Sequence, residues 1–274
     1  MNVNEIIEQV TREVCASLGA APAMQTGGDT APAALAKYID HTLLLPQAGT
    51  EDVRRVCDEA RKHQFAGVCV NPSHIRLAAE LLEGSGVTPC CVIAFPFGAV
   101  PPESKASETA EAIGSGAREV DMVVNTGAVK EGDWMLVKRD IEAVTGTAQG
   151  RAGVKVIIEA GLLTEEEIVK VCTVARLAGA DFIKTSTGFF SGGATVEAVR
   201  LIRQTVGPDM GVCASGGICN YQECVEMIRA GANRVGTNDS VQIINGGGTS
   251  CIHCGACRQT CPTGHSSIVK QCCC

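Results

Sequence analysis

The stretch Asp181-Phe182-Ile183-Lys184-Thr185-Ser186-Thr187-Gly188 places a lysine at the end of a short apolar run, which predicts a buried β-strand. The Thr-Ser-Thr-Gly sequence that follows is typical of a turn. A lysine that ends a core strand is costly to bury unless it is paired or takes part in chemistry. Desolvation lowers the pKa of an ammonium group, and a neutral amine can attack a carbonyl carbon to form a Schiff base. The alternative at this point is a structural lysine paired with a carboxylate.

Seven similar apolar runs and a series of helical patterns alternate around this strand. The expected strands are Tyr38–Leu43, Phe65–Val70, Pro89–Ala94, Glu119–Val124, Val154–Ile158, Asp181–Lys184, Gly211–Ala214 and Asn233–Thr237. The expected helices include Thr50–His63, Glu103–Gly114, Trp134–Thr145, Thr164–Ala178, Thr195–Val206 and Asn220–Ala230. Eight strands with seven or eight helices over roughly 210 residues predict an α/β fold, a (β/α)8 TIM barrel over residues 35–246. A doubly wound open sheet is the alternative, disfavoured because no glycine-rich phosphate fingerprint follows the first strand.

Composition limits the partners and the compartment. The formal net charge of −7 argues against a nucleic acid or an anionic membrane as the main partner. No apolar run reaches the roughly 20 residues of a membrane span, and the N-terminus lacks the pattern of a secretory signal. We therefore expect a cytoplasmic protein. The chain has 16 cysteines, which in a reducing compartment are thiols or metal ligands rather than disulfides.

Charged residues inside the apolar strands indicate an active site. In a (β/α)8 barrel the chemistry lies at the C-terminal ends of the strands. Asp121, Lys155 and Lys184 come from neighbouring strands, and a carboxylate close to two amines can keep one protonated while the other is neutral. That is the arrangement of an amine nucleophile with an acid/base partner. Without Lys184, a structural ion pair between Asp121 and Lys155 would be an equal interpretation.

Five motifs occur in an order and spacing similar to those of the deoxyribose-phosphate aldolase family, from Tyr38 to about Gly247. The motifs are Ile39-Asp40-His41-Thr42-Leu43-Leu44, Val120-Asp121-Met122-Val123-Val124-Asn125, Lys155-Val156-Ile157-Ile158-Glu159, Phe182 to Gly188, and Ala214-Ser215-Gly216-Gly217-Ile218. The resemblance implies a class I aldolase whose aldol chemistry needs no cofactor. It would reversibly cleave 2-deoxyribose 5-phosphate to glyceraldehyde 3-phosphate and acetaldehyde. Its partners would then be small sugar-phosphate and aldehyde substrates, and a homo-oligomer is expected.

The resemblance also implies roles for individual residues. Lys184 matches the Schiff-base lysine, and Asp121 matches the aspartate that assists proton transfer around the carbinolamine. Lys155 and Cys213 complete the expected catalytic set. Backbone positions that match the family's phosphate cradle, and polar groups expected at the same strand ends, make up the expected substrate site: Asp40, Thr42, Cys69, Thr187, Gly188, Gly216, Gly217 and Gly236.

The chain departs from the family at two places. Cys213 stands where the family usually has a second lysine, which helps to depress the pKa of the nucleophile. Lys155 as a substitute cation is a hypothesis. At the phosphate end, Asp239 would repel a phosphate dianion, and Cys219 replaces a common arginine. A catalytically weakened barrel, with a redox or sensing role in the C-terminal segment, is therefore the alternative function.

The N-terminal segment predicts an amphipathic helix over residues 1–20 and a flexible linker over residues 21–34. Ile6, Ile7, Val10, Val14 and Leu18 recur at helical spacing, and Ala, Pro, Gly and Thr dominate the linker. The helix resembles the short extensions that direct enzymes into bacterial microcompartments by binding a shell protein. The alternative is a helix that folds back on its own domain.

The C-terminal segment, residues 247–274, carries seven of the cysteines. Cys251, Cys254, Cys257, Cys261 and Pro262 match the C-x2-C-x2-C-x3-C-P run of bacterial ferredoxins. This pattern predicts a [4Fe–4S] cluster, with Cys272, Cys273 or Cys274 as an alternative fourth ligand. Zinc on four thiolates, or an unliganded thiol-reactive segment, are the other interpretations.

Overall fold

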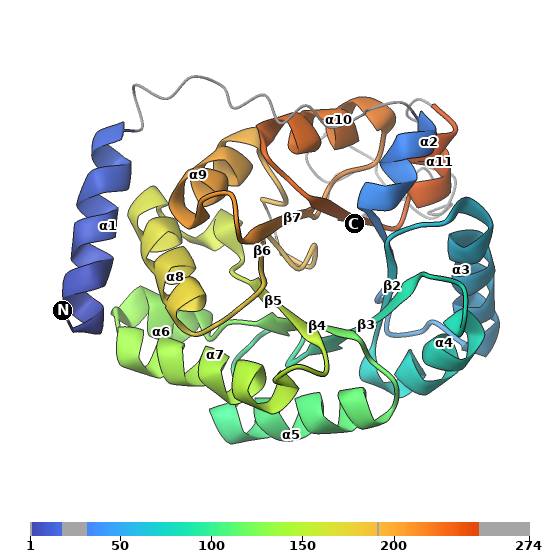
Figure 1. Cartoon of the computed structure of the whole chain (residues 1–274), viewed down its shortest axis with the longest axis horizontal. Coiled ribbons are helices and arrows are strands. Elements are labelled where there is room, and N and C mark those ends of the chain that lie inside the picture. The colour runs from blue at the N-terminus through green and yellow to red at the C-terminus, as the bar shows by residue number, and fades with distance from the viewer. Residues whose placement is uncertain (1, 18–31, 191, 247–274) are drawn as a thin grey trace, which may run out of the picture.

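A computed structural model describes residues 2–17, 32–190 and 192–246, and it contains a closed barrel of eight parallel strands (Figure 1). The strands pair in chain order, and β8 closes the barrel against β1. The (β/α)8 prediction is confirmed, and the open doubly wound sheet is excluded. The strands are β1 Ile39–Leu43, β2 Gly67–Val70, β3 Thr88–Ile93, β4 Glu119–Val123, β5 Gly153–Ile157, β6 Phe182–Lys184, β7 Gly211–Ser215 and β8 Arg234–Thr237.

Helices surround the barrel on all sides (Figure 1). The six helices expected between the strands all form, with ends within three residues of the expected ones. Three helices after strand ends, α4, α6 and α11, are short and were not predicted individually. The α-helices are α1 Val3–Ser17, α2 Pro32–Leu35, α3 Thr50–His63, α4 Ile75–Leu82, α5 Pro102–Gly114, α6 Thr126–Glu131, α7 Trp134–Ala148, α8 Glu165–Leu177, α9 Val196–Val206, α10 Tyr221–Ala230 and α11 Ser240–Ile244.

The apolar strands form because both of their faces are covered, one by the helices and one by the barrel interior. The main core contains aliphatic side chains from β1 to β8 and from the inner faces of the helices, which matches the low aromatic content of 3%. Local signals set the helix ends. Thr164 and Glu167 form a reciprocal capping box at the start of α8, and Asn220 caps α10 through its side chain.

Strand register brings the expected catalytic residues together. Asp121 on β4 lies directly opposite Lys155 on β5, and Lys184 on β6 lies opposite Cys213 on β7. Lys184 is also the last residue of its strand, whereas Asp121 and Lys155 each lie at the middle of theirs. Lys184 therefore lies closer to the C-terminal end of the barrel than Asp121 and Lys155 do.

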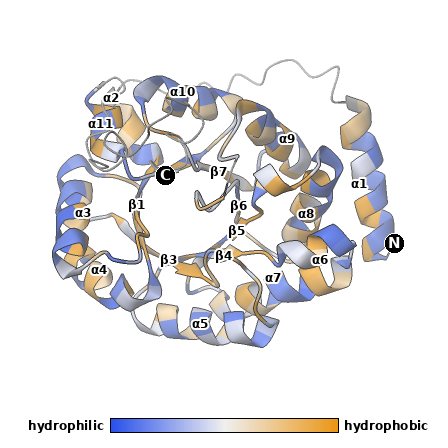
Figure 2. Cartoon of the chain, turned by 180° about the vertical axis from the view of Figure 1, so that it is seen from behind, coloured by the Kyte–Doolittle hydropathy of each residue, from blue (hydrophilic) through white to orange (hydrophobic). Residues whose placement is uncertain are grey.

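Helix α1 packs against the outer face of α8, outside the ring of helices (Figures 1 and 2). Ile7 is buried there, with 1% of its surface exposed, and Lys170 Nζ lies 2.9 Å from Glu8 Oε1. This is the folded-back arrangement that the sequence left as an alternative. The expected helix extends to residue 20, and residues 18–20 lie outside the described residues.

The remaining sequence expectations for the two ends concern residues that the structure does not describe. The expected linker, residues 21–34, is described only from Pro32, where the short helix α2 begins. The cysteine motif from Cys251 to Cys261 lies wholly outside the described residues. Among the helices that are described, none has both the length and the apolar character needed to cross a membrane.

Candidate active site

A small cavity of about 40 Å³ opens at the C-terminal ends of the strands, beside the amine of Lys184. The lining comes from the C-terminal ends of β1, β6, β7 and β8 and from the residues that follow them. It contains polar side chains, glycines and two aliphatic residues: Thr42, Leu44, Lys184, Thr187, Gly188, Ser215, Gly216, Gly217, Ile218, Gly236, Thr237 and Asn238.

Six of the eight expected substrate-binding residues line this cavity: Thr42, Thr187, Gly188, Gly216, Gly217 and Gly236. The other two lie elsewhere in the barrel. Asp40 accepts a hydrogen bond from Arg234 Nε at 3.0 Å, and Cys69 lies against Asp121. Both side chains are buried, and neither is part of the cavity lining.

The carboxylate of Asp121 binds two lysines at once. Its Oδ2 accepts a hydrogen bond from Lys184 Nζ at 2.7 Å, and its Oδ1 accepts one from Lys155 Nζ at 3.0 Å. All three side chains are at least 98% buried. Lys184 is therefore paired with a carboxylate and also lines a cavity. It combines features of both interpretations that its sequence left open, a paired structural lysine and a reactive amine.

The pKa of Lys184 is shifted in the direction opposite to the one that the sequence suggested. Burial is the largest single influence on the pKa of Lys184 and lowers it, but the charge of Asp121 and smaller contributions from neighbouring groups together raise the pKa above its ordinary value. Burial raises the pKa of Asp121, yet Lys155 and Lys184 together hold it well below its usual range. The pKa of Lys155 is likewise raised, chiefly by Asp121 against the effect of burial. The expectation of a neutral amine beside a protonated one was wrong, because both lysines share the charge of Asp121 and the pKa of each lies above its ordinary value.

Two charged residues that the sequence analysis did not single out complete the network below the cavity. Glu119 bonds to Lys155 Nζ, and its carboxylate also accepts from Arg234. Arg234 in turn bonds to Asp40, whose other oxygen lies 3.9 Å from Lys155 Nζ. Glu119 and Arg234 each begin a strand, where charged residues are usually solvated, so their residue types gave little signal. Their register opposite Gly153 and Cys213 could have suggested an inward position.

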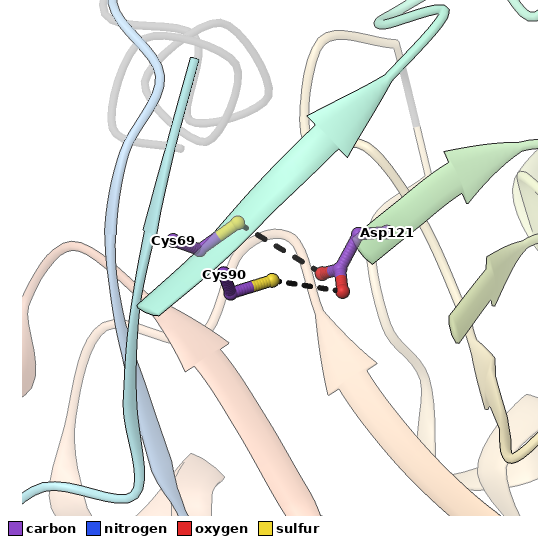
Figure 3. A group of neighbouring side chains, drawn as sticks. All are labelled: Cys69, Cys90 and Asp121. Carbon is purple, nitrogen blue, oxygen red and sulfur yellow. Dashed lines mark hydrogen bonds between the residues drawn. The ribbon is translucent and has the colours of Figure 1, made fainter. Parts of the chain in front are cut away.

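Two thiols approach the Asp121 carboxylate from β2 and β3 (Figure 3). Cys90 Sγ lies 3.0 Å from Oδ1, and Cys69 Sγ lies 3.8 Å from Oδ2. The three ligand atoms lie within 4.8 Å of one another, a spacing that a metal ion could use. However, both carboxylate oxygens already accept bonds from lysines, and burial raises the pKa of Cys90 well above its ordinary value. Two neighbouring ammonium groups and neutral thiols do not suit a cation.

Cys213 leaves the β7 side of Lys184 without a charge. Its thiol is completely buried, and burial raises its pKa to about 12. The thiol is therefore neutral at physiological pH and cannot depress the pKa of Lys184 as a neighbouring ammonium group would. Lys155, the hypothetical substitute, binds the opposite oxygen of Asp121, and the pKa of Lys184 is still raised.

A larger cavity of about 650 Å³ lies at the opposite end of the barrel, near the starts of β5 and β6. Arg118, Arg151 and Asp181 are among its lining residues. It does not reach Lys184, and the reactive ends of the strands in this fold lie at the other face. We therefore assign the small cavity, despite its size, as the candidate active site.

Comparison with known proteins places most of the chain in one family. A family model described as DeoC/LacD family aldolase matches residues 34–250. Deoxyribose-phosphate aldolases of Streptococcus gordonii, a Geobacillus species and Clostridium novyi are 57%, 56% and 54% identical to this chain over 212 residues. The matched region is 77% of this chain and 95% or 96% of each relative. About a quarter of this chain therefore lies outside these alignments.

Solved structures agree with this assignment. A Coccidioides immitis protein assigned to the deoxyribose-phosphate aldolases superimposes with a TM-score of 0.83 at 37% identity, over 89% of this chain and 97% of that chain. The deoxyribose phosphate aldolase of Aeropyrum pernix, described as a tetramer, gives a TM-score of 0.75 at 32% identity, with the same coverage.

Placing a lysine at position 213 is expected to lower the pKa of Lys184. In Cys213→Lys a second ammonium group lies beside Lys184, and like charges at this range shift a pKa by about 1–3 pH units. The added buried charge is also expected to cost several kcal/mol of stability, on the order of 3 kcal/mol. Reductive methylation with ¹³C-formaldehyde, followed by NMR titration of the labelled Lys184, measures the pKa. Urea unfolding measures the stability.

Cys213→Met is the matched control, since it fills a similar volume without a charge. It is expected to leave the Lys184 pKa within about 0.5 pH units of the parent value. An unchanged pKa in Cys213→Lys would contradict the electrostatic account of this site.

Proposed function

The chain belongs to the DeoC/LacD family of aldolases, and from that premise we propose that it is a class I deoxyribose-phosphate aldolase. It cleaves 2-deoxy-D-ribose 5-phosphate reversibly to D-glyceraldehyde 3-phosphate and acetaldehyde, with Lys184 as the Schiff-base nucleophile. The observation that carries the proposal is the position of the Lys184 amine. It lies 2.7 Å from the Asp121 carboxylate and also lines the cavity at the reactive end of the barrel.

The reaction begins when Lys184 loses a proton and its Nζ attacks the aldehyde carbon of the open-chain sugar. Because the pKa of Lys184 is raised, only a small neutral fraction is available at physiological pH. Loss of water from the carbinolamine gives a protonated imine. The carbinolamine oxygen would lie near Asp121, the carboxylate within hydrogen-bond distance of Nζ, so we assign proton transfer at this step to Asp121.

Carbon–carbon cleavage follows from the imine. A base removes the proton of the C3 hydroxyl, the C2–C3 bond breaks, and its electron pair moves into the imine to give an enamine. Glyceraldehyde 3-phosphate leaves at this point. Protonation at C2 regenerates the imine, and hydrolysis releases acetaldehyde and the free amine. Lys155 is bound to both Asp121 and Glu119, so we assign it the role of holding the Asp121 carboxylate in place.

Glycines give the cavity room for the phosphate end of the substrate. Gly216 and Gly217 have φ values of +94° and +78°, in the region that favours glycine. A Cβ atom on Gly236 would lie 3.0 Å from the Ser215 side chain and 3.8 Å from Lys184 Nζ, inside the cavity. We propose that the backbone at these positions and at Gly188 holds the phosphate, because glycine has no side chain and lets backbone N–H groups approach an anion closely. Asn238 lines the cavity beside Gly236 and Thr237, and Asp239 follows it at the start of α11.

Borohydride reduction in the presence of acetaldehyde is expected to attach one ethyl group to Lys184. Peptide mass spectrometry locates the added group, and activity with 2-deoxyribose 5-phosphate is expected to fall with it. Lys184→Arg is the matched control, since it keeps a cation beside Asp121 but forms no imine. It is expected to lose activity by a factor of at least about 10³ and to remain unmodified at this position. An unmodified parent protein would refute the proposal and favour a barrel that has lost its aldol chemistry.

We also propose that the C-terminal segment binds a [4Fe–4S] cluster through Cys251, Cys254, Cys257 and Cys261. The support is the spacing of the four cysteines and the following Pro262, since the segment lies outside the described residues. Protein purified without oxygen is expected to contain about four iron atoms and four acid-labile sulfides per chain. Cys254→Ser should abolish both signals and leave aldolase activity unchanged. Zinc without sulfide would overturn the cluster in favour of a zinc site.

We propose further that residues 1–20 direct the enzyme to a bacterial microcompartment by binding a shell protein. The support is the amphipathic pattern of the segment and the reactivity of acetaldehyde, which gives a reason to enclose the enzyme that makes it. Deletion of residues 1–20 is expected to abolish co-localisation with shell proteins while leaving activity intact. Co-localisation that survives the deletion would refute the targeting role.

A further inference from the structure

Glu159 occupies an unusual position immediately after β5, next to the candidate active site. Its backbone is left-handed, with φ +52° and ψ +59°, a conformation that a non-glycine residue rarely adopts. Its side chain is buried, with 1% of its surface exposed. One carboxylate oxygen, Oε1, has no hydrogen-bond partner among the described residues.

Each of these features opposes folding. A left-handed backbone at a non-glycine residue stores strain, and burial raises the pKa of the Glu159 carboxyl because the charged form is desolvated. Hydrogen bonds from Thr187 are the only effects that act against that rise. Strained and incompletely satisfied groups of this kind cluster at functional sites, where the surrounding structure holds them in place.

The carboxylate is bonded to the turn that follows Lys184. Glu159 Oε2 accepts hydrogen bonds from the backbone N–H of Thr187 at 3.0 Å and from its hydroxyl at 2.6 Å. The same hydroxyl accepts a bond from the backbone N–H of Phe189 at 3.1 Å. Thr187 and Gly188 both line the cavity. Glu159 is therefore bonded to a segment that forms part of the cavity wall.

The backbone of Lys184 is held by other bonds. The N–H of Ile158 donates to the carbonyl oxygen of Lys184 at 3.0 Å, and the N–H of Ala160 donates to that of Thr185 at 2.8 Å. Thr185 is also bonded to Ser215 on the other side. The main chain at Lys184 is thus held by bonds that do not involve the Glu159 carboxylate, and the amine is held by Asp121, while the Thr187–Gly188 turn is bonded to the Glu159 carboxylate.

We propose that Glu159 is a positioning residue for substrate binding: it sets the Thr187–Gly188 turn against the phosphate-bearing end of the substrate without acting on Lys184. The proposal rests on the aldolase function proposed above. It explains why a strained, buried carboxylate stands at this position, and it separates binding of the phosphorylated end from formation of the imine.

Glu159→Gly removes the carboxylate and suits the left-handed backbone, so the variant is expected to fold with a melting temperature within a few degrees of the parent. The KM for 2-deoxyribose 5-phosphate is expected to rise about tenfold, because a charge-assisted pair of bonds to the turn is lost. The kcat and the rate of borohydride trapping of acetaldehyde on Lys184 should stay within about threefold of the parent.

Three further variants make the test specific. Thr187→Val should raise KM as Glu159→Gly does, and the double variant should be no worse than the worse single one, because both changes break one interaction. Glu159→Gln keeps an acceptor and should restore most of the affinity. Gln64→Gly is the matched control, since Gln64 has a φ of +56° but lies exposed at the end of α3, and its KM should not change.

Hydrogen exchange adds a measurement that does not depend on the identity of the substrate. In the unliganded Glu159→Gly protein, amide exchange at residues 186–189 should increase, with no change at residues 182–185. A lower melting temperature with unchanged KM and unchanged exchange would reduce Glu159 to a structural role. A parallel loss of acetaldehyde trapping would also overturn the proposal, since Glu159 would then act on Lys184. Failure of trapping in the parent protein would instead refute the proposed aldolase.

Discussion

The interior of this barrel depends on one carboxylate, that of Asp121, bound by two buried lysines at once. Charges inside a protein are stable only when they are paired and hydrogen-bonded, and removing one partner leaves an expensive unpaired charge. Asp121 satisfies Lys155 and Lys184, while Glu119, Asp40 and Arg234 extend the network toward the other end of the barrel. Three carboxylates and three cations therefore balance one another in a largely buried network.

The same interaction sets the limits of the chemistry. Asp121 holds the Lys184 amine at the cavity and in the right orientation, but it also favours the protonated form of that amine. The family resemblance led us to expect a second lysine on the seventh strand, and this chain has the neutral thiol of Cys213 there. The charge balance of the network is thus a compromise between the stability of the barrel and the reactivity of its nucleophile, a balance often seen in active sites.

Much of the fold follows from the sequence because parallel strands covered on both faces must be continuously apolar. Asp121, Lys155 and Lys184 were identifiable for the same reason, since charges are rare inside such strands. The position of a side chain along the barrel axis is harder to predict from the sequence. Asp40 was expected at the substrate but lies below it, because residue type does not encode which layer of the barrel a side chain occupies.

Other features of the site depend on tertiary context alone. The upward shift of the Lys184 pKa depends on a 2.7 Å contact with Asp121 across the barrel, which acts with smaller neighbouring contributions against the desolvation that the sequence suggested. Glu119 and Arg234 resemble ordinary surface residues at strand starts. The left-handed backbone of Glu159 has no signal in its residue type, because glutamate is not a residue that favours such a conformation.

The docking of α1 on α8 has a consequence for any assembly in which this enzyme takes part. The apolar side of α1, including Ile7, is already covered by the barrel. A second protein that recognised this side could bind only after the helix had left its own domain. Its affinity would then be reduced by the cost of opening, so recruitment would be an exchange of one helix partner for another. The free energy of docking α1 on its own domain, to which the Lys170–Glu8 pair contributes, would set which fraction of the enzyme is bound to the partner.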